Sequence, residues 1–198
     1  MIPNILTIGR ILLTPLFIIC LFHEAIWARP MALLIFIVAS ITDAWDGYIA
    51  RKKGLVTKTG KFLDPLADKI LVSSAFISFA IMGKIPYWMV VLIIFRDLFI
   101  TGMRMLFLSR GLSMITSQVA KMKTVIQVSA IIFILTYFAS KTLTFIDISA
   151  IILFIDKFHL IYYFTLFATI FTVFTGISYL YSNRGTIREF LTSSDSTL

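Results

Sequence analysis

Charged residues are scarce in this chain. Aspartate, glutamate, lysine and arginine together make up 14% of its 198 residues, whereas soluble domains are usually about a quarter charged. A single cysteine, Cys20, excludes an intramolecular disulfide, and only two histidines are present. Because 59% of the residues are hydrophobic, the composition predicts an integral membrane protein rather than a soluble enzyme with an anchor.

Acidic residues are also fewer than basic ones, 10 against 18, which gives a net charge of +8. In a soluble protein this balance would suggest a nucleic-acid partner. In a chain this apolar, the gathering of lysine and arginine on the cytoplasmic side of a membrane explains it better. We therefore expect membrane lipid around the protein and no nucleic acid.

Six apolar segments each come near the ~20 residues that a helix needs to cross a bilayer. The sequence therefore predicts an all-α fold, a polytopic membrane protein with six transmembrane helices in one domain over residues 1–198. The segment 141–157 mixes apolar residues with aspartates and is interpreted as an outer-surface or re-entrant piece, and 189–198 as a flexible tail. The six predicted spans are 5–22, 31–49, 63–82, 87–108, 122–139 and 158–182.

Lysine and arginine are unevenly distributed between the loops. They gather in 51–61, in 104–123 and near the C-terminus, while the loops at the other ends of the spans carry few. By the positive-inside tendency, both termini and the 51–61 loop are expected to face the cytoplasm. Aspartates flank that loop, so a candidate active site is expected at the same face.

These aspartates form two pairs beside the loop. Asp43 and Asp46 end one apolar segment, and Asp64 and Asp68 begin the next. At spacings of three and four residues, each pair shares a helix face. Carboxylates near a membrane are costly unless they are paired or bind a cation, and oxygen ligands suit hard divalent cations. The pattern predicts a metal site, with pairing to nearby lysines and arginines in a solvated loop as the alternative.

Small residues accompany the first pair. On a helix, Gly47 and Ala50 fall within about 60° of Asp43, so a bulky ligand could approach the backbone beside the carboxylates. Arg51 could donate a forked pair of hydrogen bonds to phosphate oxygens. Together these residues suit a diphosphate–metal complex.

A second group of polar residues lies on later segments. Arg96 and Asp97 interrupt the fourth span, where ionisable groups usually mark function, although the two could also simply pair with neighbours inside the bundle. We predict a basic pocket for a phosphorylated acceptor. For each cation in it, extension toward lipid headgroups is the alternative. Its members are Thr101, Arg104, Lys121, Lys123 and Arg184.

The aspartate stretch resembles the signature of the CDP-alcohol phosphatidyltransferase family, D-x2-D-G-x2-A-R-x8-G-x3-D-x3-D. The residues Asp43, Asp46, Gly47, Ala50, Arg51, Gly60, Asp64 and Asp68 fill it without departure. The resemblance implies that the aspartates bind two divalent cations, Mg²⁺ or Mn²⁺, which clamp the diphosphate of CDP-diacylglycerol. It also implies that an alcohol attacks the phosphatidyl phosphorus, that CMP leaves, and that Asp68 takes the alcohol's proton. Gly47, Ala50 and Gly60 would leave room for cytidine beside Arg51.

The same resemblance extends to the acceptor and the assembly. The stretches RDLFITGMR and VAKMKTVIQ look like those of bacterial family members that use sn-glycerol 3-phosphate. Departures include Asp97 for glutamate, Thr101 for serine and Ala120 for glycine. The family further implies a homodimer, and we expect it in a bacterial inner (cytoplasmic) membrane.

Two other functions stay open at this point. The acceptor could be phosphatidylglycerol, as in the cardiolipin synthases of this family, or an inositol phosphate. A divalent-cation transporter would also place carboxylates in a membrane. It would need polar groups through the whole bilayer depth, however, and the outer halves of the predicted spans are almost purely apolar.

Overall fold

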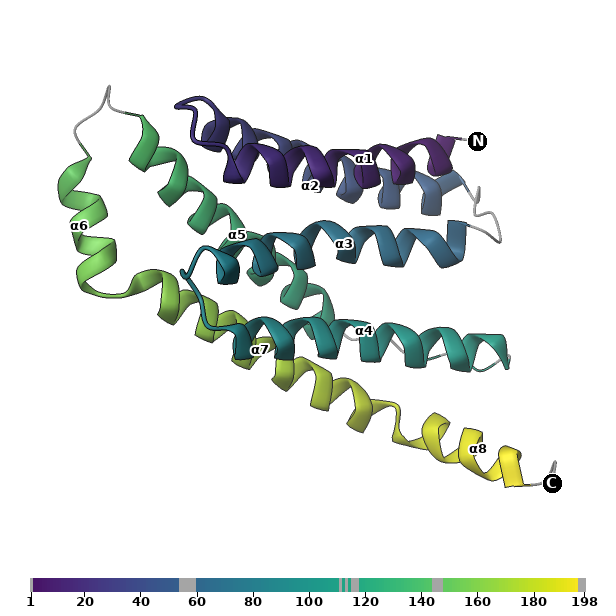
Figure 1. Cartoon of the computed structure of the whole chain (residues 1–198). Helices are drawn as coiled ribbons and strands as arrows, with labels where there is room; N and C mark the ends of the chain where they lie inside the picture. The colour runs from purple at the N-terminus through teal and green to yellow at the C-terminus, as the bar shows by residue number, and fades with distance from the viewer. Residues whose placement is uncertain are drawn as a thin grey trace.

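The structure, a computed structural model, describes residues 2–53, 60–110, 112, 114, 118–143 and 148–195. Within these residues the fold is entirely helical, and no strand is present (Figure 1). The all-α prediction is therefore confirmed. The helices are α1 (Ile2–Phe22), α2 (Ala28–Lys53), α3 (Gly60–Ile81), α4 (Tyr87–Ser109), α5 (Gln118–Thr142), α6 (Ser149–Lys157), α7 (Leu160–Ser182) and α8 (Arg184–Asp195).

The turn between α3 and α4 shows how the sequence stops one helix and starts the next. Gly83 adopts a φ of 67°, a left-handed conformation that glycine accepts without a Cβ clash. The backbone N–H of Lys84 then donates to the Phe79 carbonyl at 3.0 Å, which closes the end of α3. Pro86, with a φ of −69°, directly precedes Tyr87, the first residue of α4. A backbone N–H at this position would have no partner within the helix, so the N–H that proline lacks costs no helical hydrogen bond.

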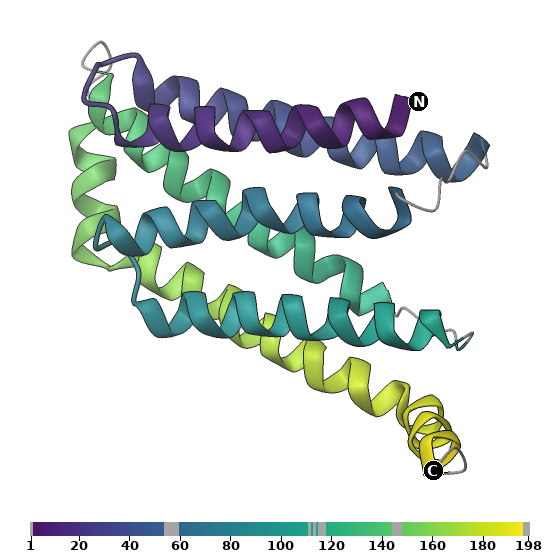
Figure 2. The same ribbon diagram turned by 45° about the vertical axis from the view of Figure 1, so that its right-hand side comes forward.

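The long helices pack into one bundle. α1 lies against α2 and α3, and α5 connects the two halves because it contacts both α2 and α7. α4 packs between α3 and α7, as Figures 1 and 2 both show. The short helix α6 forms a corner at one end of the bundle, and α8 continues from α7 at the other. This arrangement brings α3, α4, α5 and α7 together around one interior.

The main core is built from phenylalanine and branched aliphatic side chains. Phe17, Phe36, Phe76 and Phe79 are fully buried in it, and α5 adds several isoleucines and a leucine. A second, smaller core lies where α4 and α7 end. Phe107, Met114 and Tyr179 form that core, and residues of α8 pack against it.

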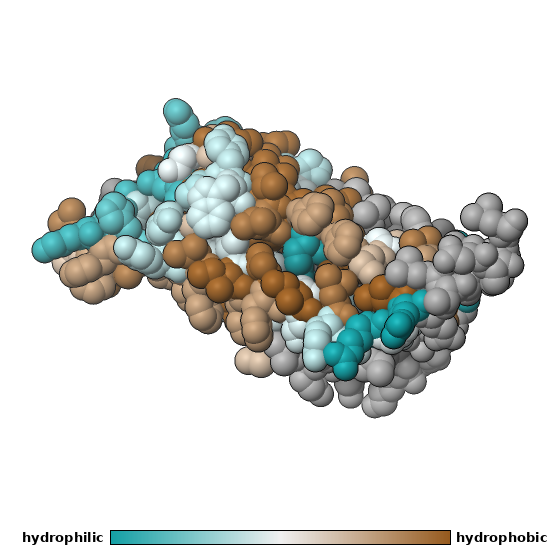
Figure 3. Space-filling model, turned by 90° about the horizontal axis from the view of Figure 1, so that it is seen from below, coloured by the Kyte–Doolittle hydropathy of each residue, from teal (hydrophilic) through white to brown (hydrophobic). Residues whose placement is uncertain are grey.

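The outer surface of the bundle is strongly apolar. Phe95 and Ile177, for example, are each 63% exposed, and large hydrophobic side chains are exposed on every long helix. In Figure 3 such residues fill the middle of one face. Two helical stretches, Met122–Thr142 and Leu160–Ser182, are long and apolar enough to cross a membrane. A surface of this kind suits lipid rather than water, which fits a membrane protein.

The helices differ from the predicted segments mainly at their ends. Each of the six predicted spans coincides with a long helix, but α2 runs on to Lys53 and α5 begins at Gln118. The segment 141–157 contains the short helix α6. Residues 189–195, expected to be part of a flexible tail, continue α8, and residues 196–198 lie outside the described chain.

A hydrogen-bonded group fastens α6 to α5. The Tyr137 hydroxyl donates to Oδ1 of Asp156 at 2.6 Å, and the Lys141 ammonium donates to Oδ2 at 3.2 Å. The hydrogen bond from Tyr137, followed by that from Lys141, holds the pKa of Asp156 below its usual range. The charged form of the Asp156 carboxylate therefore stabilises the folded state.

We predict that Tyr137→Phe destabilises this end of the bundle while keeping the ring that Lys84 and Lys141 approach. A hydrogen bond to a charged group contributes at least about 1 kcal/mol to the free energy of unfolding. We expect about 1 kcal/mol here, because the Asp156 side chain is 46% exposed and solvent weakens the interaction. For a chain of this length the apparent Tm should fall by about 2–4 °C at pH 7, measured in detergent.

The loss should depend on pH. Because folding lowers the pKa of Asp156 from 3.8, its stabilisation is present above about pH 4 and is lost as the pH falls through the lowered value. The Tm difference should therefore shrink toward pH 3, whereas Tyr163→Phe, at an exposed tyrosine, should change little at either pH. An equal loss at both pH values would assign the effect to packing.

Candidate active site

The four motif aspartates are carried by two consecutive helices. Asp43 and Asp46 lie in the C-terminal half of α2, and Asp64 and Asp68 lie in the first turns of α3. The end of α2 and the start of α3 meet at one end of the bundle (Figure 1). Of the predicted nucleotide-binding residues, Gly47, Ala50 and Arg51 belong to α2, and Gly60 begins α3. The side chains of this motif lie outside the described part of the structure, so their roles remain predictions.

Three charged side chains meet in the interior nearby. The Lys123 ammonium donates to both carboxylate oxygens of Asp97, at 2.7 and 2.6 Å, and both residues are only 5% exposed. Nη1 of Arg96 donates to the same carboxylate at 3.1 Å. Burying one of these charges alone would be strongly unfavourable, so each requires the others. We call Arg96, Asp97 and Lys123 the buried ion cluster.

The buried ion cluster joins three helices. Arg96 and Asp97 come from α4 and Lys123 from α5. Nη2 of Arg96 also donates to the Thr175 hydroxyl of α7 at 3.2 Å. Gly176 makes this crossing possible, because a Cβ at that position would lie 2.9 Å from Cγ of Arg96. The sequence analysis left pairing inside the bundle open for Arg96 and Asp97, and the structure shows that pairing.

A stripe of buried threonines continues from the cluster along α7. Thr165, Thr169, Thr172 and Thr175 are each at most 2% exposed. Thr165, Thr169 and Thr175 donate to backbone carbonyls three or four residues earlier, and Thr172 accepts a hydrogen bond from Gln127 of α5 at 3.1 Å. These bonds satisfy polar groups that are buried in the interior.

The predicted acceptor residues occupy different environments. Thr101 donates to the Asp97 carbonyl at 2.7 Å, within α4. Arg104 is exposed on the same helix, and Lys123 is held by Asp97. The exposed Arg184 guanidinium lies over the Tyr181 ring at 4.5 Å, and the side chain of Lys121 lies outside the described structure. The structure therefore places Thr101 and Arg104 on α4, Lys123 on α5 and Arg184 at the start of α8.

Lys69 connects this region to the aspartate motif. It directly follows Asp68 on α3 and interacts electrostatically with both Asp97 and Lys123. The cationic region therefore adjoins the end of the motif. Arg96 and Lys123 both form ion pairs with Asp97, and Lys69 interacts with the same carboxylate electrostatically.

Sequence reasoning did not single out Gly176, Tyr179 or the threonine stripe. Tyr179 is 4% exposed, and within the described residues its hydroxyl has no hydrogen-bond partner. Arg96 and Arg104 both interact electrostatically with that hydroxyl. The recurrence of threonine every three or four residues from Thr165 to Thr175 was a usable signal, because it marks one helix face.

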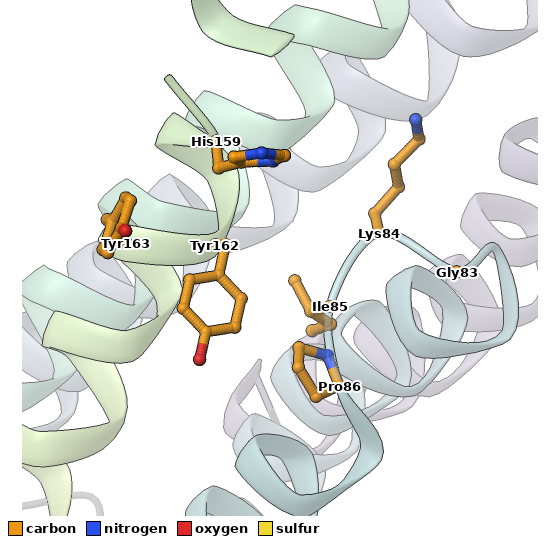
Figure 4. A pocket seen from close by; sticks show the side chains of 7 residues that line it. All are labelled: Gly83, Lys84, Ile85, Pro86, His159, Tyr162 and Tyr163. Atoms are coloured by element: carbon orange, nitrogen blue, oxygen red, sulfur yellow. The ribbon is translucent and has the colours of Figure 1, made fainter. Parts of the chain in front are cut away.

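A separate cavity of about 480 Å³ lies at the opposite end of α3 from the motif. The turn Gly83–Pro86 forms one wall, and His159, Tyr162 and Tyr163 at the start of α7 form the other. Figure 4 shows the rings of His159 and Tyr162 on the side of α7 that faces this turn. Neither the aspartates nor the buried ion cluster line it, so it is not part of the candidate site.

Comparison with known proteins places the chain in a family. The CDP-alcohol phosphatidyltransferase family model matches residues 1–174, which include both the motif helices and the buried ion cluster. The chain belongs to the CDP-alcohol phosphatidyltransferase family. The family prediction from the aspartate signature is thereby confirmed.

Curated relatives carry more specific names. A Bacillus subtilis protein named CDP-diacylglycerol--glycerol-3-phosphate 3-phosphatidyltransferase is 43% identical over 141 residues, 65% of this chain and 73% of the relative. A Rickettsia felis protein of the same name is 35% identical over 178 residues, 89% of this chain and 92% of the relative. A Mycobacterium tuberculosis protein named probable phosphatidylglycerophosphate synthase is 42% identical over 133 residues, 65% of this chain and 62% of the relative.

Proposed function

We propose that this protein transfers the phosphatidyl group from CDP-diacylglycerol to sn-glycerol 3-phosphate, giving phosphatidylglycerophosphate and CMP. The observation that carries the proposal is the similarity to the Rickettsia relative of that name, which extends over 89% of this chain and 92% of the relative. The complete aspartate signature on α2 and α3 supports the same chemistry. The deciding experiment is an acceptor screen with purified protein, scored by release of CMP from CDP-diacylglycerol.

The donor site is assigned to the motif. Asp43, Asp46, Asp64 and Asp68 supply only oxygen ligands, and this donor set fits hard divalent cations such as Mg²⁺ or Mn²⁺. Two such cations, when bound, neutralise charge on the phosphoryl oxygens and on the leaving CMP. Gly47, Ala50 and Gly60 leave space for the cytidine, and Arg51 donates to phosphate oxygens.

Asp68 acts as the base in this proposal. The acceptor hydroxyl gives its proton to the Asp68 carboxylate while its oxygen forms a bond to the phosphatidyl phosphorus. The bond from that phosphorus to the CMP oxygen breaks, and CMP leaves with the electron pair. The helical placement of Asp68 beside Lys69, which interacts with the buried ion cluster, supports a base located between donor and acceptor.

The acceptor phosphate is assigned to the cationic side chains of α4, α5 and the start of α8. The cations that interact with Asp97 favour an anionic ligand nearby. Thr101, Arg104, Lys121, Lys123 and Arg184 are the proposed ligands. Of these, Arg104 and Arg184 are the exposed guanidinium groups that could form paired hydrogen bonds with phosphate oxygens.

We further propose a six-span topology in a bacterial inner membrane. The helices α1, α2, α3, α4, α5 and α7 cross the bilayer, while α6 and α8 lie at opposite ends of the bundle. Lysine and arginine near α2, α8 and the α4–α5 connection favour a cytoplasmic location for the active site and both termini. A homodimer is proposed on family resemblance alone.

Two rival functions predict different experimental results. Phosphatidylglycerol or an inositol phosphate as the preferred acceptor would keep the donor chemistry and change the product. A divalent-cation transporter would move ions across liposomes without CDP-diacylglycerol. The apolar surface around the bundle and the paired state of its buried charges favour the enzyme.

We predict that excess chelator abolishes CMP release and that added Mg²⁺ or Mn²⁺ restores it, since the motif offers oxygen ligands alone. The measurement is initial rate against free metal concentration in detergent. Full turnover in excess chelator would overturn the metal assignment.

We predict that Asp64→Asn lowers activity by at least about 10²-fold, because a metal-holding carboxylate is lost. Asp156→Asn is the matched control, since it removes a carboxylate at the other end of the bundle and should leave the rate of CMP release nearly unchanged. A near-normal rate for Asp64→Asn would make the motif structural in this chain.

Arg104→Ala should raise the KM for glycerol 3-phosphate about 10- to 100-fold, because charge-assisted hydrogen bonds to phosphate contribute about 1.5–3 kcal/mol. The KM for CDP-diacylglycerol should barely change. Arg110→Ala is the matched control, since the exposed Arg110 guanidinium lies over the Phe190 ring at 4.3 Å, outside the proposed pocket. Weakened donor binding with an unchanged acceptor KM would reassign Arg104 to the nucleotide.

A further inference from the structure

Gly176 of α7 lies against the side chain of Arg96 of α4. A methyl group there would lie 2.9 Å from Cγ, 3.2 Å from Nε and 3.6 Å from Cδ of Arg96. Real Cβ atoms essentially never show the first of these distances, so any larger residue must displace the Arg96 side chain. Gly176 thus has a specific role that its place in an apolar helix does not predict.

The Arg96 side chain, which lies against Gly176, donates hydrogen bonds to two different helices. One terminal nitrogen donates to Asp97 of its own helix, and the other donates to Thr175 of α7. Its Nε is buried and has no hydrogen-bond partner among the described residues. The Arg96 side chain therefore has a fixed position with one donor left over.

Asp97 links the Arg96 side chain to α5. The same carboxylate that accepts from Arg96 accepts two hydrogen bonds from Lys123. Among the described side chains, two cations therefore bond to one buried carboxylate, and Lys69 interacts with that carboxylate electrostatically. Through Arg96 and Lys123 this cationic group joins α4, α5 and α7.

The proposed acceptor residues adjoin this cluster. Thr101 lies one turn beyond Asp97 and bonds to its carbonyl, and Arg104 follows on the same helix. Tyr179, three residues after Gly176, has a hydroxyl that interacts electrostatically with Arg96 and Arg104 alike. The relative positions of α4 and α7 at Gly176 therefore govern the surroundings of both arginines.

We propose that Gly176 is a positioning residue of the acceptor site: its missing side chain admits Arg96, whose positive charge is thereby held in the buried ion cluster, next to the residues proposed to bind the phosphate of the acceptor alcohol. The inference rests on the proposed function, because the anion that the charge attracts is the acceptor phosphate. Gly176 itself contacts no substrate.

The chain supplies a matched pair of substitutions. Gly176→Ala and Gly102→Ala make the same change in a helix, and both should gain helix propensity. A Cβ at Gly102 has nothing within 4 Å, whereas one at Gly176 meets Arg96. Any difference between the two variants therefore reports the contact with Arg96.

Gly176→Ala should raise the KM for glycerol 3-phosphate about tenfold, equal to about 1.4 kcal/mol, with the KM for CDP-diacylglycerol within about twofold of wild type. Gly102→Ala should leave both constants within about twofold. A parallel rise in both KM values for Gly176→Ala would overturn the proposal, because it would indicate a general packing role. An unchanged KM for glycerol 3-phosphate would also overturn it, because Gly176 would then have no role in acceptor binding.

A double-mutant cycle tests the route through Arg96. Arg96→Ala should raise the acceptor KM, and adding Gly176→Ala should then have no further effect, because the displaced side chain is gone. The double variant also removes the steric clash, so it reports on the proposal even when Gly176→Ala alone folds poorly. Additive effects of the two substitutions would contradict the proposal.

The wild-type acceptor screen separates this inference from the proposed function. When another phosphate-bearing alcohol is the acceptor, the proposed function fails, and the same KM ratios measured with that alcohol decide the role of Gly176. When glycerol 3-phosphate is the acceptor and the ratios do not change, the inference alone fails. Absence of CMP release with every alcohol would overturn both.

Discussion

The pairing of Asp97 with two cations is the interaction on which the candidate site depends. The side chains of Arg96, Asp97 and Lys123 are at most 12% exposed, so each charge must be compensated by its neighbours. The carboxylate also fixes geometry, because the cations reach it from two helices and Arg96 continues to a third. Breaking this contact would expose uncompensated charge and separate the helices that carry the proposed acceptor residues.

Small and hydroxyl-bearing residues on α7 make this polar interior possible. Gly176 lets a long arginine lie against the helix, and the buried threonines satisfy their own hydroxyl groups through the preceding turn of backbone. Membrane helices commonly approach each other through such residues, because apolar side chains gain little from leaving lipid. At the other end of the bundle the group around Asp156 has a different character, since it is exposed and fastens only α6 to α5.

The sequence predicted most of the helices and the residues of the aspartate motif, because both depend on short-range patterns. Apolar length identified the six long helices, and the 43–68 spacing identified the family. It did not predict that Arg96 bonds to Thr175, 79 residues away, or that Gly176 is the point of contact, since neither periodicity nor composition specifies which faces of two helices meet. Lys123 illustrates the same limit. Its basic character suggested a phosphate ligand, and only the fold shows that Asp97 already engages it.

Two sets of positive charge are needed for the proposed reaction, and the fold keeps them on different helices. The donor diphosphate and the acceptor phosphate are both anionic, so bringing them together is opposed by repulsion unless each is neutralised separately. The carboxylates of α2 and α3 would suit the donor, because oxygen ligands can hold divalent cations with the charge to neutralise a diphosphate. The arginines and lysines of α4, of α5 and of the start of α8 would suit the acceptor, because these side chains carry positive charge themselves. Lys69 is one residue beyond Asp68 and interacts electrostatically with Asp97, so in the proposed reaction this part of α3 is where the attacking hydroxyl and its base would meet.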